Sequence, residues 1–190
     1  MLKKLISSAR NIMNVRGLAL TGMLISVYAV LGYFKIPPTG NNRVTLTFAA
    51  VAVTGIVLGP VPAMLVGAIG DFLAFLMNSG GGPYFLGYAL TAVLVGLIYG
   101  FCLYGINLPD KSKKSKLRVL LIILLANLLI AVFANILLNT LWLSMTNGKA
   151  FVVLIWPRIV KNIFTAIGNT IVVYILFMLI EREGIRKKYL

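Results

Sequence analysis

The chain of 190 residues carries 18 Lys and Arg, four Asp and Glu and no His, which gives a formal net charge of +14 at pH 7. Hydrophobic residues make up 60% and charged residues 12%, whereas soluble domains are about half apolar and about a quarter charged. A water-soluble globule is therefore excluded, and one cysteine without any histidine leaves no internal disulfide and no Cys/His metal cluster.

Apolar runs of membrane length alternate with polar or turn-forming segments along the chain. Residues 1–16 have the spacing of a short amphipathic helix, which predicts a segment at the membrane interface. Residues 181–190 form a basic tail. Between them, residues 17–180 are predicted to form a compact bundle of six transmembrane helices, so the expected fold class is an all-α integral membrane protein. The six helices are expected at residues 17–34, 44–58, 62–78, 84–106, 118–145 and 152–180.

The second and third of these helices are short, because a hydrocarbon core of about 30 Å requires about 20 helical residues. A tight turn predicted at Gly59-Pro60-Val61-Pro62 separates them, so together they could form a compact hairpin. Longer connections are expected at residues 35–43, 79–83, 107–118 and 146–151.

The distribution of Lys and Arg predicts the orientation of the bundle. Thirteen of these bases fall in the N-terminal segment, the 107–118 loop and the tail, whereas the opposite loops hold only Lys35, Arg43 and Lys149. Cytoplasmic loops of membrane proteins carry the excess of positive charge. Both termini and the 107–118 loop are therefore expected in the cytoplasm, where the bases also meet anionic lipid. A nucleic-acid partner, which would require a basic face on a soluble fold, is not expected.

Three charged residues fall within membrane depth, where charges are costly and mark candidate functional sites. Asp71 lies in the third span, while Arg158 and Lys161 lie one turn apart in the sixth, with Asn162 close to the same face. Pro157 is expected at or before the first turn of that helix. A cationic site near the outer side would attract an organic anion, since arginine can clamp a carboxylate with two hydrogen bonds. The alternative is a structural ion pair between Asp71 and one of the bases.

Polar and aromatic residues also occur at helical spacing in the fifth span. Asn135 and Asn139 are one turn apart, and Trp142 follows one turn later. The amides could bond the edge of a flat heterocycle while the indole stacks on its face. Interhelical hydrogen bonds and an interfacial aromatic belt explain these residues equally well, and the belt also accounts for Tyr84. The candidate ligand-binding residues are Arg158, Lys161, Asn162, Asn135, Asn139, Trp142, Asp71, Tyr84 and Arg43.

Small residues on two spans allow helices to approach closely. Gly67 and Gly70 in the third span are expected to serve packing within the bundle. Ala19, Gly22 and Ser26 in the first span form a candidate face for docking a partner helix.

Enzyme chemistry is not predicted. Three of the four acidic residues, Asp110, Glu181 and Glu183, lie in the loop and tail assigned to the cytoplasm. No paired carboxylates, Ser-His pair or metal cluster can be assembled from the sequence, and it contains no ATP-binding motif. Catalytic residues and a bound metal are therefore not expected, and ATP-driven transport would require other subunits.

A set of motifs spread over residues 15–180 points to one known family. The matching segments are Val44-Thr45-Leu46-Thr47-Phe48, Gly59-Pro60, Gly67-Ala68-Ile69-Gly70-Asp71-Phe72, Pro83-Tyr84-Phe85-Leu86-Gly87-Tyr88, Gly96-Leu97-Ile98-Tyr99-Gly100, Asn135, Asn139-Thr140-Leu141-Trp142 and Arg158-Ile159-Val160-Lys161-Asn162. With these motifs the chain resembles the substrate-binding S components of energy-coupling factor (ECF) vitamin transporters. The Asn/Trp pattern followed by Arg-x-x-Lys-Asn is most similar to the folate-specific group.

The resemblance implies a six-helix bundle in a bacterial cell membrane that captures folate or a related vitamin from outside. It also implies three partners, a membrane coupling subunit and two cytoplasmic ATPases, so ATP would be used by the partners and the chain would need no cofactor. The family's first helix docks on the coupling subunit through two alanines four residues apart, and the matching pair here is Gly22 and Ser26. Riboflavin and pantothenate remain the nearest rival ligands. A membrane scaffold protein without a ligand is the alternative from another class.

Overall fold

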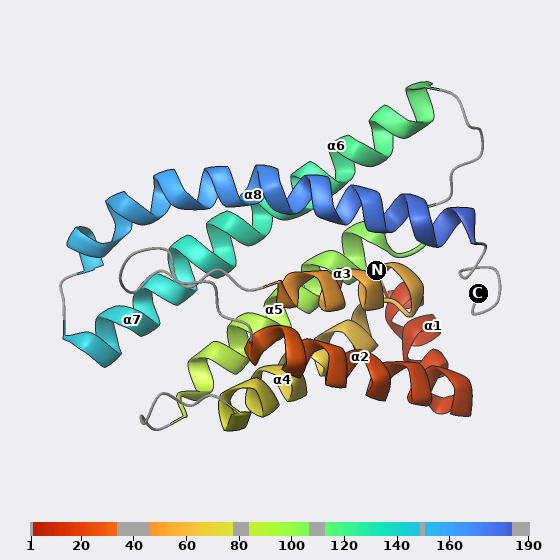
Figure 1. Ribbon diagram of the computed structural model, residues 1–190, viewed down its shortest axis with the longest axis horizontal. Coiled ribbons are helices and arrows are strands. Elements are labelled where there is room, and N and C mark those ends of the chain that lie inside the picture. The colour runs from red at the N-terminus through yellow and green to blue at the C-terminus, as the bar shows by residue number, and fades with distance from the viewer. Residues whose placement is uncertain (1, 34–45, 78–83, 107–112, 149–150, 184–190) are drawn as a thin grey trace.

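The computed structural model describes residues 2–33, 46–77, 84–106, 113–148 and 151–183, and the secondary structure within these ranges is helical (Figure 1). The α6, η1 and α7 segments follow one another without a break and form one long helix, of which η1 is the π-helical part. In chain order the elements are α1 (Leu2–Met13), α2 (Val15–Tyr33), α3 (Thr47–Val57), α4 (Pro60–Met77), α5 (Leu86–Leu103), α6 (Lys113–Leu129), η1 (Ile130–Leu138), α7 (Asn139–Asn147) and α8 (Phe151–Arg182).

The predicted all-α membrane class is confirmed, but six full spans are not. Within the described residues, five helical stretches are long and apolar enough to cross a membrane. The remaining apolar helix, α3, has 11 residues. At about 1.5 Å per residue it rises about 16 Å, which is about half of a hydrocarbon core of about 30 Å. The five long stretches are Val15–Tyr33, Pro60–Met77, Leu86–Leu103, Lys113–Thr146 and Leu154–Arg182.

Three local predictions were wrong in their boundaries. The turn between α3 and α4 is confined to Leu58 and Gly59, which has a φ of 96°, and Pro60 already begins α4 because the first helical position tolerates proline. The basic loop ends earlier than expected because α6 begins at Lys113, and lysine and arginine are good helix formers. Pro157 lies inside α8 and not at its first turn.

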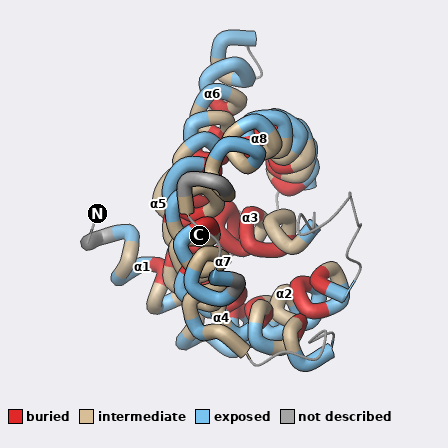
Figure 2. The backbone as a smooth tube through the Cα atoms, turned by 90° about the vertical axis from the view of Figure 1, so that its left-hand side faces the viewer, coloured by how far each residue is buried: buried red, intermediate tan, exposed pale blue. Residues whose placement is uncertain are grey.

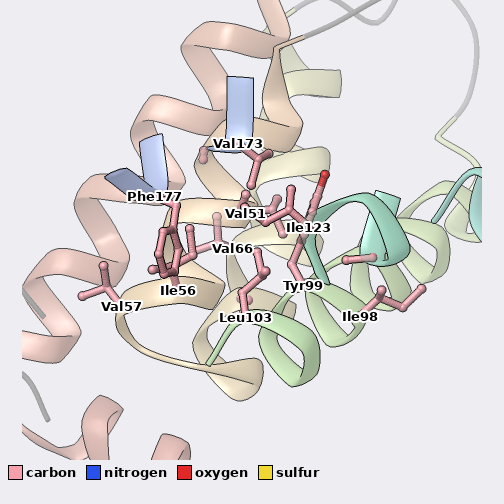
Figure 3. Packing of buried hydrophobic residues seen from close by; sticks show 14 of the residues in the cluster. Val51, Ile56, Val57, Val66, Ile98, Tyr99, Leu103, Ile123, Val173 and Phe177 are labelled. Carbon is pink, nitrogen blue, oxygen red and sulfur yellow. The ribbon is translucent and has the colours of Figure 1, made fainter. Parts of the chain in front are cut away.

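The α3 helix forms the centre of the bundle. It contacts α2, α4, α5 and α8, and Figure 2 shows it largely buried among them. Side chains from α3, α4, α5, α6 and α8 converge around it in Figure 3, among them Ile56, Tyr99 and Phe177. A helix that is apolar on all sides is expected to be enclosed in this way. Its buried residues are Ala50, Val51, Ala52, Thr54, Gly55, Ile56 and Val57.

Glycines bring α4 close to its neighbours. A Cβ atom at Gly67 would lie 2.5 Å from the carbonyl oxygen of Ala92 on α5, and one at Gly70 would lie 2.6 Å from the ring of Tyr28 on α2. Both distances are far below ordinary van der Waals contact, so only glycine permits these helix separations. The packing role predicted for Gly67 and Gly70 is confirmed.

The helix ends gather at two opposite ends of the bundle. Figure 1 places α1, the start of α6 and the end of α8 at one end, and α7 with the start of α8 at the other. The N-terminal helix, the start of α6 and the C-terminal end of α8 thus share one side, as the charge distribution predicts. Which side faces the cytoplasm stays a prediction.

Candidate functional site

The candidate ligand-binding residues within the described ranges lie on α4, on the segment entering α5, on η1 and α7, and on the N-terminal part of α8. The α5 helix contacts α4 on one side and η1 and α7 on the other, and α8 contacts η1 and α7, toward the end of the bundle that carries α7 (Figure 1). Arg43 lies outside the described residues.

Asp71 and Tyr84 form a contact between α4 and the segment before α5. The hydroxyl of Tyr84 donates a hydrogen bond to a carboxylate oxygen of Asp71 at 3.0 Å. The Tyr84 ring packs against Phe72 and Phe75, with centroid separations of 5.2 and 5.0 Å. Burial and the neighbouring Asp71 carboxylate raise the pKa of Tyr84, so its hydroxyl remains a proton donor at neutral pH.

The indole of Trp142 on α7 is held by α5. Its Nε1–H donates to the hydroxyl of Thr91 at 3.1 Å, and the ring of Phe85 lies 5.6 Å from it. Gly87 leaves room for the indole, because a Cβ atom there would lie 2.7 Å from its Cδ2 atom. The buried Thr91 hydroxyl in turn donates to the carbonyl of Gly87 at 3.1 Å, which turns its lone pairs toward the indole. The plane of the Trp142 ring is therefore fixed.

Arg158 on α8 faces α7. Its Nη1 donates to the hydroxyl of Thr140 at 3.4 Å, which is long for a hydrogen bond. Lys161 follows one turn later, and both bases are partly exposed. The guanidinium has five N–H donors, and among the described residues only the bond to Thr140 engages it, so most of these donors are available to an anion. The buried Asn162 donates its amide to the carbonyl of Arg158 at 2.8 Å, within the helix.

The sequence left open a structural ion pair between Asp71 and either Arg158 or Lys161. Asp71 accepts a hydrogen bond from Tyr84 at 3.0 Å, and Arg158 donates one to Thr140 at 3.4 Å. The basic pair therefore belongs to the α7–α8 side of the site and Asp71 to the α4–α5 side.

The asparagines of the long helix divide into two kinds. Asn139 donates to the side chain of Asn135 at 3.3 Å, and the backbone N–H of Asn139 bonds to the carbonyl of Ala134, five residues earlier. Such π-helical turns are rare and often occur at functional sites. Asn127, in contrast, is buried and accepts a hydrogen bond of 2.7 Å from Tyr99 on α5, so for this residue the interhelical role holds.

Thr91, Thr140 and Gly87 contribute to the site but were not among the candidate residues predicted from the sequence, although Gly87 and Thr140 lie in the family motifs. Thr91 and Gly87 lie one turn apart on α5, and Thr140 stands between Asn139 and Trp142 in a segment already considered. The hydroxyl of a helical threonine usually bonds to a carbonyl of its own helix. The interhelical partners of Thr91 and Thr140 could therefore not be predicted from the residue type. The signal that was available is the position of Thr140 within the Asn-Thr-Leu-Trp segment.

The candidate docking residues occupy another surface. Ala19, Gly22 and Ser26 are exposed on α2, and no atom of the described residues lies within 4 Å of a Cβ atom built at Gly22. The opposite face of α2, which includes Thr21 and Tyr28, is buried in the bundle. The small-residue face thus points away from the bundle.

A family model described as the substrate-specific component of ECF transporters matches residues 16–177. The chain belongs to this family. The match covers the long helices and every candidate ligand-binding residue, but it leaves out α1. The family is one of transport subunits that bind a substrate, not one of enzymes.

Two curated relatives of this S component carry the name folate transporter FolT. The protein from Clostridium novyi (strain NT) is 34% identical over 165 residues, which are 87% of this chain and 90% of that protein. The protein from Leuconostoc mesenteroides is 31% identical over 159 residues, covering 80% and 78% of the two chains. A crystal structure of FolT bound with folic acid matches with a TM-score of 0.69 at 30% identity, over 84% of this chain and 90% of the other.

Proposed function

We propose that this S component binds folate at the end of the bundle where α5, α7 and α8 meet. The observation that carries the proposal is the basic pair Arg158 and Lys161 on α8, of which Arg158 bonds to Thr140 in the α7 segment that also holds Trp142. The similarity to FolT proteins, one of them bound with folic acid, supports the same ligand.

The groups at the site suit the chemistry of folate. Its pterin is a flat ring with hydrogen-bonding edges, which suits the amides of Asn135 and Asn139 and the fixed face of Trp142. Its glutamate carries two carboxylates, which suit Arg158 and Lys161. Riboflavin lacks a carboxylate, and pantothenate lacks an aromatic ring, so each would leave part of the site without a partner.

Equilibrium binding tests this assignment directly. The purified protein is titrated with folic acid, riboflavin and pantothenate, and heat release or thermal stabilisation is measured. Saturable binding of folic acid with weaker or no binding of the other two supports the proposal. Preference for riboflavin or pantothenate assigns another vitamin, and absence of saturable binding by all three favours a scaffold protein.

Transport would require partners. We propose that a membrane coupling subunit and two cytoplasmic ATPases work with this chain, and that ATP is used by those partners. Family membership supports this assembly, and the exposed face of Ala19, Gly22 and Ser26 supplies a surface on which a partner helix can pack.

The proposed orientation has both termini in the cytoplasm and the α7 end outside. A cysteine replacing Lys114 should therefore react with an impermeant maleimide only after cells are permeabilised, in a Cys102→Ser background. Both Lys114 and the control position Thr146 are exposed, at opposite ends of the long helix. Thr146→Cys should react in intact cells. The reverse labelling pattern would contradict the proposed orientation, because the ligand site would then face the cytoplasm.

Thr91 should matter for affinity although it lies behind Trp142. Replacing Thr91 with valine removes the acceptor of the indole N–H, so the ring loses its fixed orientation. A neutral hydrogen bond contributes about 1 kcal/mol, so folate binding should weaken about fivefold, since about 1.4 kcal/mol is tenfold. Titration calorimetry measures the change.

Thr170→Val is the matched control for this substitution. Thr170 is likewise a buried helical threonine whose hydroxyl donates to a carbonyl one turn earlier, that of Ala166, but among the described residues no side chain of another helix donates to it. Folate affinity should stay unchanged in Thr170→Val. Equal weakening in both variants would show that Thr91 contributes only general helix stability.

A further inference from the structure

The polar side chains of α1 are bonded to the ends of two other helices. Ser8 and Asn11 each donate to the carbonyl of Leu58, just after α3, at 3.1 Å. Lys4 donates to the carbonyl of Tyr104, just after α5, at 2.8 Å. Carbonyls at helix C-termini lack partners within their own helix, so α1 satisfies groups that would otherwise need water. These bonds fix the rotation of α1 about its axis.

The opposite face of α1 consequently points outward. Ile6, Arg10 and Met13 follow one another at helical spacing on this face and are exposed, Ile6 to 53% and Met13 to 85%. Val15, at the junction with α2, is 83% exposed. Apolar side chains flanked by arginine are typical of helices that lie in the boundary between lipid headgroups and acyl chains.

A shallow cavity, open to the surface, lies beside this outward face. Its volume is about 310 Å³, and it is lined by Ile6, Ser7, Arg10 and Asn11. That volume falls at the lower end of the range of small-molecule sites, about 300–1,000 Å³. Within the described ranges no hydrogen bond engages the guanidinium of Arg10, while Ser7 and Asn11 both contact the hydroxyl of Tyr104. The cavity thus combines an available cation with hydroxyl and amide groups already held in place.

Phosphate is the group that this lining suits. Its oxygens accept two parallel hydrogen bonds from a guanidinium, and its charge complements a chain with a formal charge of +14. The cavity lies at the end of the bundle that carries both described terminal helix ends, which the charge distribution assigns to the cytoplasmic leaflet, where anionic lipids are found. The exposed Ile6 and Met13 provide the apolar surface that acyl chains require.

We propose that the cavity formed by Ile6, Ser7, Arg10 and Asn11 binds the phosphate of an anionic phospholipid, whose acyl chains run along Ile6 and Met13. This site lies outside the segment that matches the S component family. It would hold α1 on the membrane surface and, through the bonds of Ser8 and Lys4, stabilise the ends of α3 and α5.

Lipid-dependent thermal stability of the full chain in detergent tests the proposal. Short-chain phosphatidylglycerol, phosphatidylcholine of the same chain length and inorganic phosphate are titrated against the wild type, Arg10→Gln and Arg118→Gln. Arg118 is an exposed base on α6 that does not line the cavity. Phosphatidylglycerol should stabilise the wild type and Arg118→Gln equally, whereas Arg10→Gln should require about tenfold more of this lipid, which corresponds to about 1.4 kcal/mol.

Each other outcome overturns the proposal in its own way. If phosphatidylglycerol stabilises Arg10→Gln at the same concentration as the wild type, with or without a lower melting temperature, Arg10 does not bind the lipid. Its role would then be limited to a favourable charge at the C-terminal end of α1. Equal weakening in Arg118→Gln would show diffuse attraction between charges. Equal stabilisation by phosphatidylcholine would remove the selectivity for anions, and equal stabilisation by inorganic phosphate would make the cavity a site for free anions. Folate binding, measured on every variant, reports independently that the bundle is folded.

Discussion

Replacing Arg158 with alanine should weaken folate binding by about 30-fold or more. Removing one partner of a desolvated, charged hydrogen bond costs about 2–5 kcal/mol, and about 1.4 kcal/mol corresponds to a factor of ten. The loss to the free protein should be small, because the contact of Arg158 with Thr140 is 3.4 Å long. Titration calorimetry gives the affinity, and thermal denaturation without ligand gives the stability.

The control for Arg158→Ala is Arg118→Ala, which removes the same side chain from an exposed position on α6. This control should bind folate as the wild type does. Normal folate binding by Arg158→Ala together with a lower melting temperature would mean that Arg158 has a structural role. Arg158→Lys should recover only part of the affinity, because an ammonium group cannot reproduce the two parallel bonds of a guanidinium.

Replacing Gly22 with leucine should abolish folate uptake by cells while leaving folate binding intact. Helices in lipid associate through close packing of small residues, since no hydrophobic force drives them together. A leucine on this face would hold a coupling subunit away. The side chain itself meets no obstacle in the bundle, because no described atom lies within 4 Å of a Cβ atom at Gly22. Ser26→Leu should behave in the same way.

A second exposed glycine supplies the matched control. Gly168 on α8 is also exposed and has no described atom within 4 Å of a built Cβ atom. Gly168→Leu should keep both binding and uptake. Loss of binding in Gly22→Leu would indicate misfolding or a contribution to the ligand site. Normal uptake in Gly22→Leu would move the docking surface elsewhere, for which Ala19→Leu is the next variant.

The fold was largely predictable because membrane helices are long apolar runs. The first span was expected at 17–34 and α2 runs from Val15 to Tyr33. The ends of the third and fourth spans were likewise expected within about one turn of the observed ends of α4 and α5. The long helix was placed less well, because α6 begins in the basic segment at Lys113, where apolar content gives no signal. The π-helical segment η1 is strongly apolar, like the α-helical segments α3 and α5, so its composition could not reveal the π-helical turns.

The candidate site was predictable to a smaller extent. Arg158, Lys161 and Trp142 were found because a charge or a tryptophan at membrane depth is conspicuous in a sequence. Their hydrogen-bond partners Thr140 and Thr91 were not predicted, because threonine is an ordinary residue in a membrane helix. The two threonines become partners of Arg158 and Trp142 only through the packing of α7 on α8 and α5. The assignment of all these residues to folate binding stays a prediction until the variants are measured.

The shortness of α3 has a consequence for how the chain enters the bilayer. At 11 residues this helix cannot by itself satisfy the length that membrane insertion requires. Its neighbours in sequence are longer, and the turn at Leu58 and Gly59 joins it directly to α4. We therefore expect α3 to leave the insertion machinery together with α4, as one hairpin. In a nascent chain that is arrested before α4, the α3 segment should therefore not yet be integrated into the membrane.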